Sequence, residues 1–93
     1  MLYLISYDIA EKNNDYEALW AKLKEWGATK VLYSEWLVAA PPDSAMKLAT
    51  DLEHVTMPSD RVLVQEVTSN AAWTNLIVSN QAFSQIVMRD ARP

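Results

Sequence analysis

The sequence has no cysteine, and it has only one glycine and one histidine in 93 residues. The lack of cysteine excludes disulfide bonds, thiolate zinc sites and thiol nucleophiles. The single histidine, His54, gives a Ser/His/Asp triad little support, and its place late in an expected helix predicts a solvated surface residue. P-loop, dinucleotide-binding and HExxH motifs are also absent. Carboxylates are therefore the main candidates for chemistry.

Long apolar runs and an excess of basic charge are lacking too. No apolar run reaches the roughly 18 residues that a membrane-spanning helix needs, and the N-terminal strand has no basic leader of the kind found in signal peptides. We therefore expect a cytoplasmic protein. Eight Lys and Arg face twelve Asp and Glu, for a net charge of −4. Because nucleic-acid binding draws on phosphate neutralisation, this charge disfavours a nucleic-acid partner without excluding one.

Apolar and aromatic residues, by contrast, are abundant. Hydrophobic residues make up 51% of the chain, with four tryptophans and four tyrosines. We expect one domain over residues 1–93, and a domain of this size buries a smaller share of its surface than a larger one does. Tryptophan and tyrosine suit interfaces as well as cores. The apolar excess therefore predicts a homodimer.

The N-terminal segment reads as a strand that ends near an acid. Side chains alternate between the two sides of a strand. The odd-numbered residues therefore form a first set on one face, and the even-numbered residues form a second set on the other face. Tyr7 belongs to the first set and is expected in the core, whereas Asp8 closes the second. The sets are Tyr3, Ile5, Tyr7 and Ile9, and Leu2, Leu4, Ser6 and Asp8.

The middle of the chain alternates between helices and strands. A helix is expected from an Asn14 cap to Gly27, the one glycine, which suits a C-terminal left-handed residue. Residues 30–40 are β-rich and long enough for two strands joined near Tyr33 and Ser34. A second helix, capped by Asp43 or Ser44, would end before Pro58. A further strand is expected over residues 61–67, with valines 62 and 64 on one side.

The C-terminal quarter has a weaker pattern. Ser69 or Asn70 could cap a short helix that holds Trp73 and Leu76, and the residues after it fit either helix or an extended arm. The whole order predicts an α+β, ferredoxin-like βαββαβ fold, with a core over about residues 1–67 and an appendix over about 68–93. Pairing of two sheets face to face, or lending of the C-terminal segment to a partner, would then bury the open sheet face.

Two of these segments carry a resemblance to a known family. The first strand ends in Tyr7-Asp8-Ile9, and a later strand begins Lys30-Val31-Leu32-Tyr33-Ser34-Glu35-Trp36. Together with the glycine-closed helix, they resemble the small CRISPR-associated protein two (Cas-two) family and its relatives, which include VapD-type ribonuclease toxins and uncharacterised bacterial proteins. The family pattern has Gln at the position of Leu32 and Val at that of Glu35, so the chain departs from it there.

The resemblance implies a ferredoxin-like homodimer and gives Asp8 a role. In nuclease members, the matching aspartates of two subunits lie near the two-fold axis and hold a divalent metal that activates water. Carboxylate oxygens suit Mg or Mn, and a bound cation lowers the pKa of its water. On this basis Asp8 is the candidate catalytic and metal-binding residue, with Ser6 in support. The acidic and apolar start of the first helix lacks the basic residues of nucleic-acid-binding members.

Each of these residues also has a structural explanation. Asp8 can act as a turn-forming cap at the strand end, and Ser6 can bond to a neighbouring group. One of Ser34 and Glu35 would approach the strand end if the chain bends there, although serine is common in such bends and Glu35 can mark an exposed strand position. Two functions follow: a diverged Cas-two-like homodimeric interaction or scaffolding module, or a metal-dependent endonuclease acting on RNA or DNA through paired Asp8 residues. The sequence leaves the enzyme question open.

Overall fold

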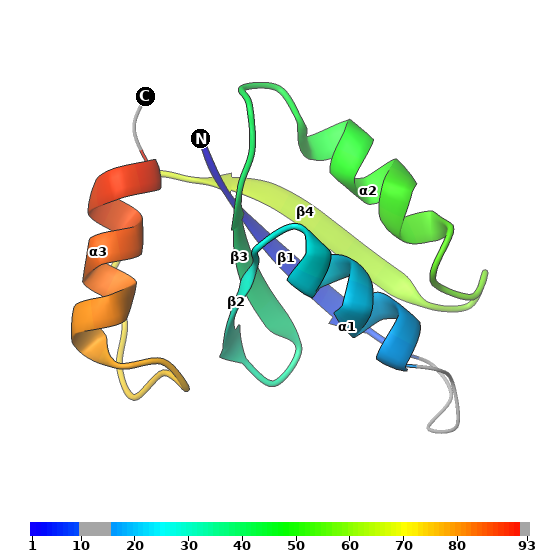
Figure 1. Cartoon of the computed structure of the whole chain (residues 1–93), viewed down its shortest axis with the longest axis horizontal. Coiled ribbons are helices and arrows are strands. Elements are labelled where there is room, and N and C mark those ends of the chain that lie inside the picture. Colours follow the sequence, from blue (N-terminus) through cyan, green and yellow to red (C-terminus); the bar gives the residue numbers. More distant parts are fainter. Residues whose placement is uncertain (10–15, 92–93) are drawn as a thin grey trace.

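The computed structural model describes residues 1–9 and 16–91, which form four strands and three helices. The expected Asn14 cap lies outside the described residues. The elements follow the order β1, α1, β2, β3, α2, β4 and α3 (Figure 1). Their bounds are β1 (Leu2–Asp8), α1 (Tyr16–Glu25), β2 (Thr29–Leu32), β3 (Glu35–Ala39), α2 (Ala45–Glu53), β4 (Arg61–Val67) and α3 (Asn80–Asp90).

The strands form one antiparallel sheet in the order β2-β3-β1-β4. β1 is central: Ser6 lies opposite Glu35 of β3 and opposite Leu63 of β4. An α+β fold was predicted and is confirmed. The predicted division of the segment 30–40 is confirmed as well, because a turn at Tyr33 and Ser34 separates β2 from β3.

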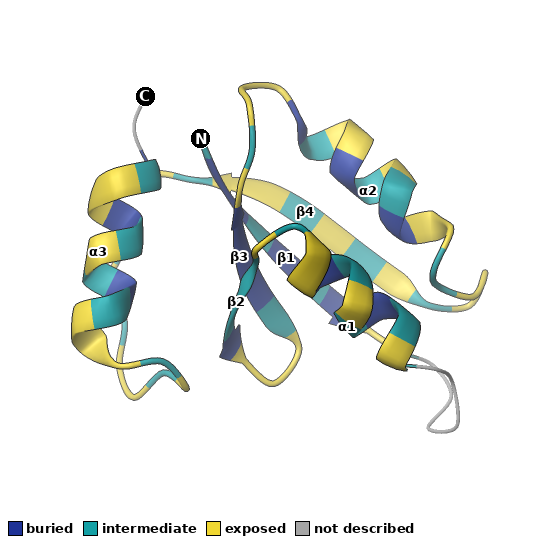
Figure 2. Cartoon of the chain, viewed as in Figure 1, coloured by how far each residue is buried: buried dark blue, intermediate teal, exposed yellow. Residues whose placement is uncertain are grey.

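One face of the sheet is covered by α1 and α2. Period-2 alternation in β1 sends Tyr3, Ile5 and Tyr7 to this side, where they pack with Leu19 and Leu23 of α1 and with residues of α2. In Figure 2 the buried residues of both helices face the sheet. Helix α1 ends as predicted: Gly27 has φ of +74°, a conformation that glycine adopts without strain.

The opposite face is covered at one end by α3. Phe83, Val87 and Ala91 pack there against Leu2 and Leu37. The C-terminal segment thus lies on the sheet of its own chain rather than projecting from it. At the other end of this face, Asp8 is exposed. We call the part of this face around Ser6, Asp8, Glu35, Arg61 and Leu63 the open patch.

The C-terminal helix begins later than the sequence predicted. Neither Ser69 nor Asn70 starts a helix, and residues 68–79 are irregular. The helix begins after Ser79, whose hydroxyl accepts a hydrogen bond from the Ala82 amide at 3.1 Å. Trp73 still packs in this region, with its ring centroid 4.5 Å from that of Phe83. Its apolar contact therefore comes from an irregular segment, which a search for helical periodicity cannot detect.

The three helices are short. Within the described residues, none is long and apolar enough to cross a bilayer.

Candidate functional site

Asp8 is the last residue of β1 and lies on the face opposite α1 and α2. The sheet register places it beside Arg61, the first residue of β4, and a guanidinium nitrogen lies 3.2 Å from its carboxylate. The two side chains are 69% and 83% exposed. An ion pair this exposed is well solvated and contributes little, about 0 to 1 kcal/mol. The cationic partner of Asp8 thus comes from its own chain.

Ser6 lies on the same face, two residues earlier. Its hydroxyl donates a 2.7 Å hydrogen bond to a carboxylate oxygen of Glu35, which is directly opposite on β3. The sequence left open which of Ser34 and Glu35 would approach the end of β1, and the register places Glu35 beside Ser6. Ser34 stays in the turn, where its carbonyl accepts a bond from the Tyr7 amide at 3.1 Å. The register thus gathers Asp8, Ser6 and Glu35 on one patch.

The open patch offers two carboxylates to a metal ion. Mg and Mn take mostly oxygen ligands, and Mg prefers octahedral coordination. Over residues 1–9 and 16–91, no group of three or more His, Asp or Glu side chains is placed to hold a metal. One copy of the chain therefore supplies at most Asp8 and Glu35, and Arg61 competes for the first of them. A single subunit does not fit a divalent metal site well.

A shallow hollow lies on this patch. It has a volume of about 230 Å³ and is lined by residues from β1 and β4 only. Leu63, which is 55% exposed, forms part of its wall beside Asp8 and Arg61. The patch therefore combines an exposed ion pair with an exposed apolar side chain.

Tyr7, on the other face, gathers more hydrogen bonds than the sequence suggested. It is buried, as predicted, and its hydroxyl accepts bonds from the indole nitrogens of Trp20 at 3.0 Å and Trp36 at 3.1 Å. The same hydroxyl donates to the Tyr33 carbonyl at 3.4 Å. Because buried indole N–H groups need acceptors, the aromatic count was the signal that could have predicted this cluster. Its role is to join α1, β1 and β3.

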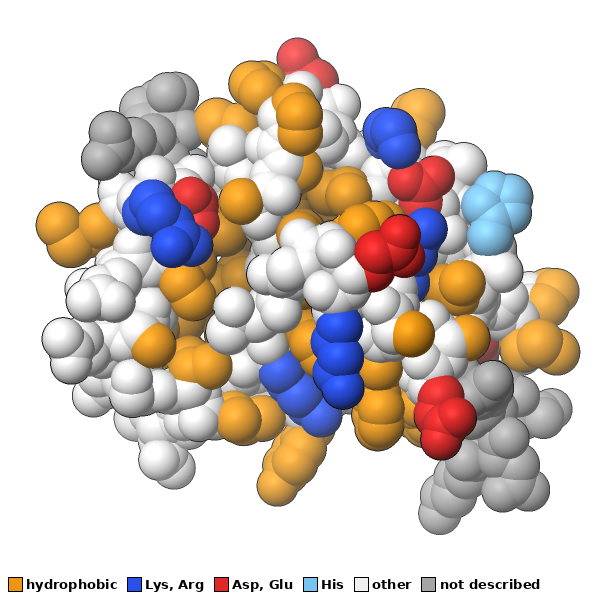
Figure 3. Space-filling model, viewed as in Figure 1, with side chains coloured by type: hydrophobic (Ala, Val, Ile, Leu, Met, Phe, Trp, Pro, Cys, Tyr) orange, Lys and Arg blue, Asp and Glu red, His pale blue; other side chains and the backbone are white. Residues whose placement is uncertain are grey.

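Basic side chains near this cluster rest on aromatic rings. The Lys30 ammonium lies 5.1 Å from the Trp20 ring centroid and 5.8 Å from that of Tyr33, and Lys22 lies 5.8 Å from Trp26. In Figure 3 the Lys and Arg side chains of the visible face lie in small separate groups, with hydrophobic side chains between them. This dispersed arrangement differs from the basic stripe that typically binds phosphate backbones.

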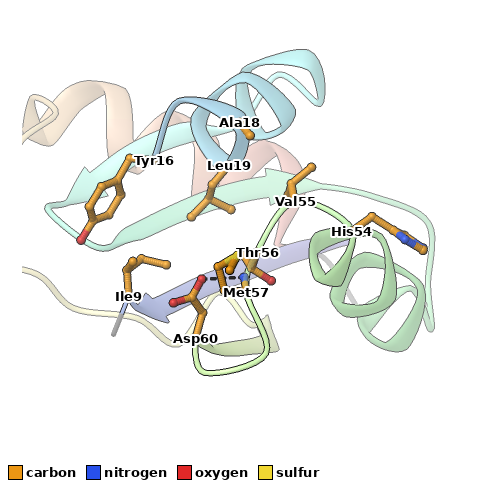
Figure 4. Close-up of a pocket in the computed structure, with 9 residues that line it drawn as sticks. All are labelled: Ile9, Tyr16, Ala18, Leu19, His54, Val55, Thr56, Met57 and Asp60. Carbon is orange, nitrogen blue, oxygen red and sulfur yellow. Dashed lines mark hydrogen bonds between the residues drawn. The ribbon is translucent and has the colours of Figure 1, made fainter. Parts of the chain in front are cut away.

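A second hollow lies between α1, Ile9 and the segment that links α2 to β4 (Figure 4). It has a volume of about 240 Å³, and its walls include Leu19, Val55 and Met57. His54 is exposed at its rim, as expected of a solvated histidine. A carboxylate oxygen of Asp60 accepts a 2.8 Å hydrogen bond from the Met57 amide, so this acid shapes the loop. The hydroxyl of Thr56, another lining residue, donates to the Leu52 carbonyl at 3.0 Å, so it too makes a local structural contact.

Comparisons with family models and with solved structures add no relative to these observations. No family model matches the chain, and no solved structure matches it significantly. The resemblance to the Cas-two family therefore stays a prediction based on the short motifs, and function has to be argued from the side chains themselves.

Proposed function

We propose that this chain is a diverged Cas-two-like protein, a cytoplasmic homodimer that acts as an interaction or scaffolding module. Two features support a ferredoxin-like domain. The first six elements follow the order βαββαβ, and the strand order 2-3-1-4 places β1 and β3 at the centre of the sheet. The element α3 is then an addition that covers part of one sheet face.

The observation that carries this proposal is the pairing of the candidate catalytic groups within the chain. Asp8 is bound by Arg61 and Ser6 donates to Glu35, so both proposed site residues have intramolecular partners. A catalytic carboxylate would have to exchange its cation for metal and substrate. In a binding module, the same contacts link side chains of three neighbouring strands on the open patch and need no ligand.

Exposed apolar side chains support the homodimer. Leu63 and Leu32, on β4 and β2, are 55% and 42% exposed, and contact with a partner would bury them. The sheet also leaves part of one face without a helix. A second copy of the chain presents the same exposed apolar residues. Closed two-fold pairs are also the commonest oligomers.

Light scattering and a cleavage assay test the proposal together. We expect a mass near twice the 10.5 kDa of one chain at micromolar concentration. We also expect no cleavage of labelled single-stranded RNA or duplex DNA with Mg or Mn. A monomer would overturn the homodimer, whereas metal-dependent cleavage that is lost in Asp8→Asn would overturn the non-enzymatic role.

One observation favours the alternative, a metal-dependent endonuclease. Asp8 and Glu35 lie on the same patch with Ser6 between them, so a two-fold axis beside this patch would gather four carboxylates. Such a set suits a divalent cation that activates water for phosphodiester cleavage. Under this alternative, Asp8→Asn abolishes cleavage, whereas Asp43→Asn, a matched change at an exposed turn residue with φ of +63°, leaves it intact.

A further inference from the structure

A groove lies between α2 and β4, which are neighbours in the fold (Figure 1). It has a volume of about 480 Å³, and ligand sites commonly measure about 300 to 1,000 Å³. Residues of α2, of β4 and of the segment between them line it. The groove is therefore large enough to hold a long side chain of another molecule.

Part of the groove is apolar. Its lining includes Ala49 of α2, Pro58, and Val62 of β4, which is half-buried against the core beneath α1 and α2. Met57, also in the lining, is 54% exposed. Methionine adapts its shape to irregular contacts, and apolar walls suit the aliphatic stems of lysine and arginine. These residues therefore favour a ligand with methylene groups.

The charged part of the groove is acidic. Glu53, the last residue of α2, is exposed and lines the groove. Asp60 lines it as well, and one of its carboxylate oxygens accepts a hydrogen bond from the Met57 amide at 2.8 Å. Among the described residues, no Lys or Arg belongs to this lining. The charged groups of the groove are thus of one sign.

The chain does not neutralise Glu53 with a cation of its own. The stretch over residues 45–67 has two basic residues, Lys47 and Arg61. Lys47 pairs with an acid one turn along α2 at 2.9 Å, and Arg61 pairs with Asp8 on the opposite face of the sheet at 3.2 Å. In the part of the chain that the structure describes, Glu53 forms no ion pair with a Lys or Arg. An incoming cation therefore need not displace one that is already bound.

We propose that this groove binds a basic segment of a partner protein, with a lysine side chain lying along it. This inference rests on the proposed interaction module and names the chemistry of its partner. The methylenes of the lysine contact Ala49 and Val62, and its ammonium reaches Glu53. The net charge of −4 favours basic partners for the chain as a whole, because charge complementarity speeds association and excludes partners of like charge.

Two further residues extend this surface and favour a protein segment over a small cation. Met46, one helical turn before Ala49 on α2, is 81% exposed. Glu66 is exposed on the face of β4 that carries Val62, about 13 Å away along the strand. A single amine reaches only one end of such a surface, whereas a segment with two lysines spans it.

A titration followed by NMR tests the groove with a designed probe, the peptide acetyl-Leu-Lys-Leu-Lys-Leu-amide. We expect the amide signals of Ala49, Glu53, Met57 and Val62 to shift together and to saturate. Binding should weaken as NaCl is raised, because salt screens exposed charges. The same peptide with glutamate in place of each lysine should cause no saturable shift.

Charge reversal at Glu53 provides the decisive variant. Glu53→Lys replaces an attraction by a repulsion and should weaken peptide binding by on the order of tenfold. Lysine at the end of a helix suits the helix dipole, so the variant should fold. Glu25→Lys is the matched control, because Glu25 is the exposed last residue of α1 and lies outside the groove. Both variants change the net charge equally, so a difference between them is local.

The outcomes distinguish the groove from the module itself. A monomer, or metal-dependent cleavage that is lost in Asp8→Asn, overturns the proposed function whatever the groove binds. If the protein is a dimer without cleavage and millimolar peptide causes no saturable shift, the module stands and the groove is wrong. Equal weakening by Glu53→Lys and Glu25→Lys also overturns the groove, since the peptide would then respond only to net charge.

Two other occupants give different results. If acetyl-lysine amide alone binds as tightly as the peptide, the ligand is a small cation rather than a protein segment. If the amides of Glu53 and Val62 shift on dilution without peptide, a second copy of the chain occupies the groove. Either result would contradict a basic partner protein.

Discussion

Tyr7 and Asp8 are neighbours in the chain but lie in two different regions of the molecule. Tyr7 points into the layer between the sheet and α1/α2, where its hydroxyl joins two indoles and a backbone carbonyl. Asp8 points to the other side, where Arg61 is its ion-pair partner and both are exposed. One peptide bond thus separates a hydrogen-bonded hub in the core, formed by the Tyr7 hydroxyl with Trp20, Trp36 and the Tyr33 carbonyl, from a solvated ion pair.

The difference shows that chemical type and structural importance are separate. The ionisable residue, which attracts attention as a site, contributes little to stability because water screens it. The phenol contributes more because it satisfies buried donors that water cannot reach. The aromatic hub therefore constrains α1, β1 and β3 together, whereas the open patch contributes less to stability.

The largest expected effect on stability comes from weakening the packing of α3 on the sheet. Phe83→Ala in α3 deletes a buried ring that packs on Trp73 and faces Leu2 and Leu37. We expect a loss of about 3 to 4 kcal/mol in the free energy of unfolding, since buried Phe to Ala changes cost this much. Urea denaturation followed by tryptophan fluorescence measures it.

The exposed neighbour Met88→Ala is the matched control for that change. It lies on the same helix, is 71% exposed, and should shift stability by less than about 0.5 kcal/mol. A similar small effect from Phe83→Ala would mean that α3 does not cover the sheet, and the open region would then extend over the whole face.

The next largest effect falls on the hub. Tyr7→Phe keeps the ring but removes the oxygen that accepts from Trp20 and Trp36, leaving at least the buried Trp36 indole without an acceptor. We expect a loss of about 2 kcal/mol, the range for a buried unsatisfied donor. Tyr33→Phe, at an 85% exposed ring, should cost almost nothing. If the two variants unfold at the same urea concentration, the hub is not a stabilising unit.

Asp8→Ala probes the exposed side of the comparison. It removes the Arg61 partner and should lower the free energy of unfolding by less than about 1 kcal/mol. Because salt screens exposed pairs, the difference from the unmodified protein should shrink as NaCl is raised. A loss as large as that of Tyr7→Phe would contradict the contrast between the two regions.

Much of this contrast follows from the sequence. Alternation in the first strand predicted that Tyr7 would face the core and Asp8 the opposite side, because successive side chains on a strand must diverge. The single glycine predicted the end of α1, and the length of the β-rich run over residues 30–40 predicted a bend near Tyr33 and Ser34. Local rules thus predicted the strands and helices among the described residues up to Val67.

Other features depend on contacts between distant residues and could not be predicted in this way. Arg61 reaches Asp8 across 53 positions only because the strand register aligns them. The short helix predicted from a cap at Ser69 or Asn70 is absent, because Trp73 and Leu76 pack from irregular backbone, where periodicity carries no signal. The partners of Ser6 and of the Tyr7 hydroxyl likewise depend on tertiary packing.

The smallest expected effect concerns an exposed ion pair on the helix-covered side, which serves as a reference for Asp8 and Arg61. The Lys47 ammonium donates a 2.9 Å hydrogen bond to Asp51 one turn along α2 and thereby lowers the pKa of that carboxyl below its usual value. A carboxyl whose pKa is lowered by folding adds stability above its unfolded pKa, and this contribution is lost as the pH falls through the folded pKa. We therefore expect Lys47→Met to be slightly less stable than the unmodified protein at neutral pH. The difference should vanish in acid, where Asp51 is protonated in both proteins.

Lys24→Met, which removes the same charge from α1, controls for net charge, and urea midpoints across the acid range measure both variants. A Lys47→Met effect that persists below the folded pKa of Asp51 would show that the lysine acts through packing of its aliphatic stem, and the pair could then no longer serve as the reference for a purely electrostatic contact at Asp8.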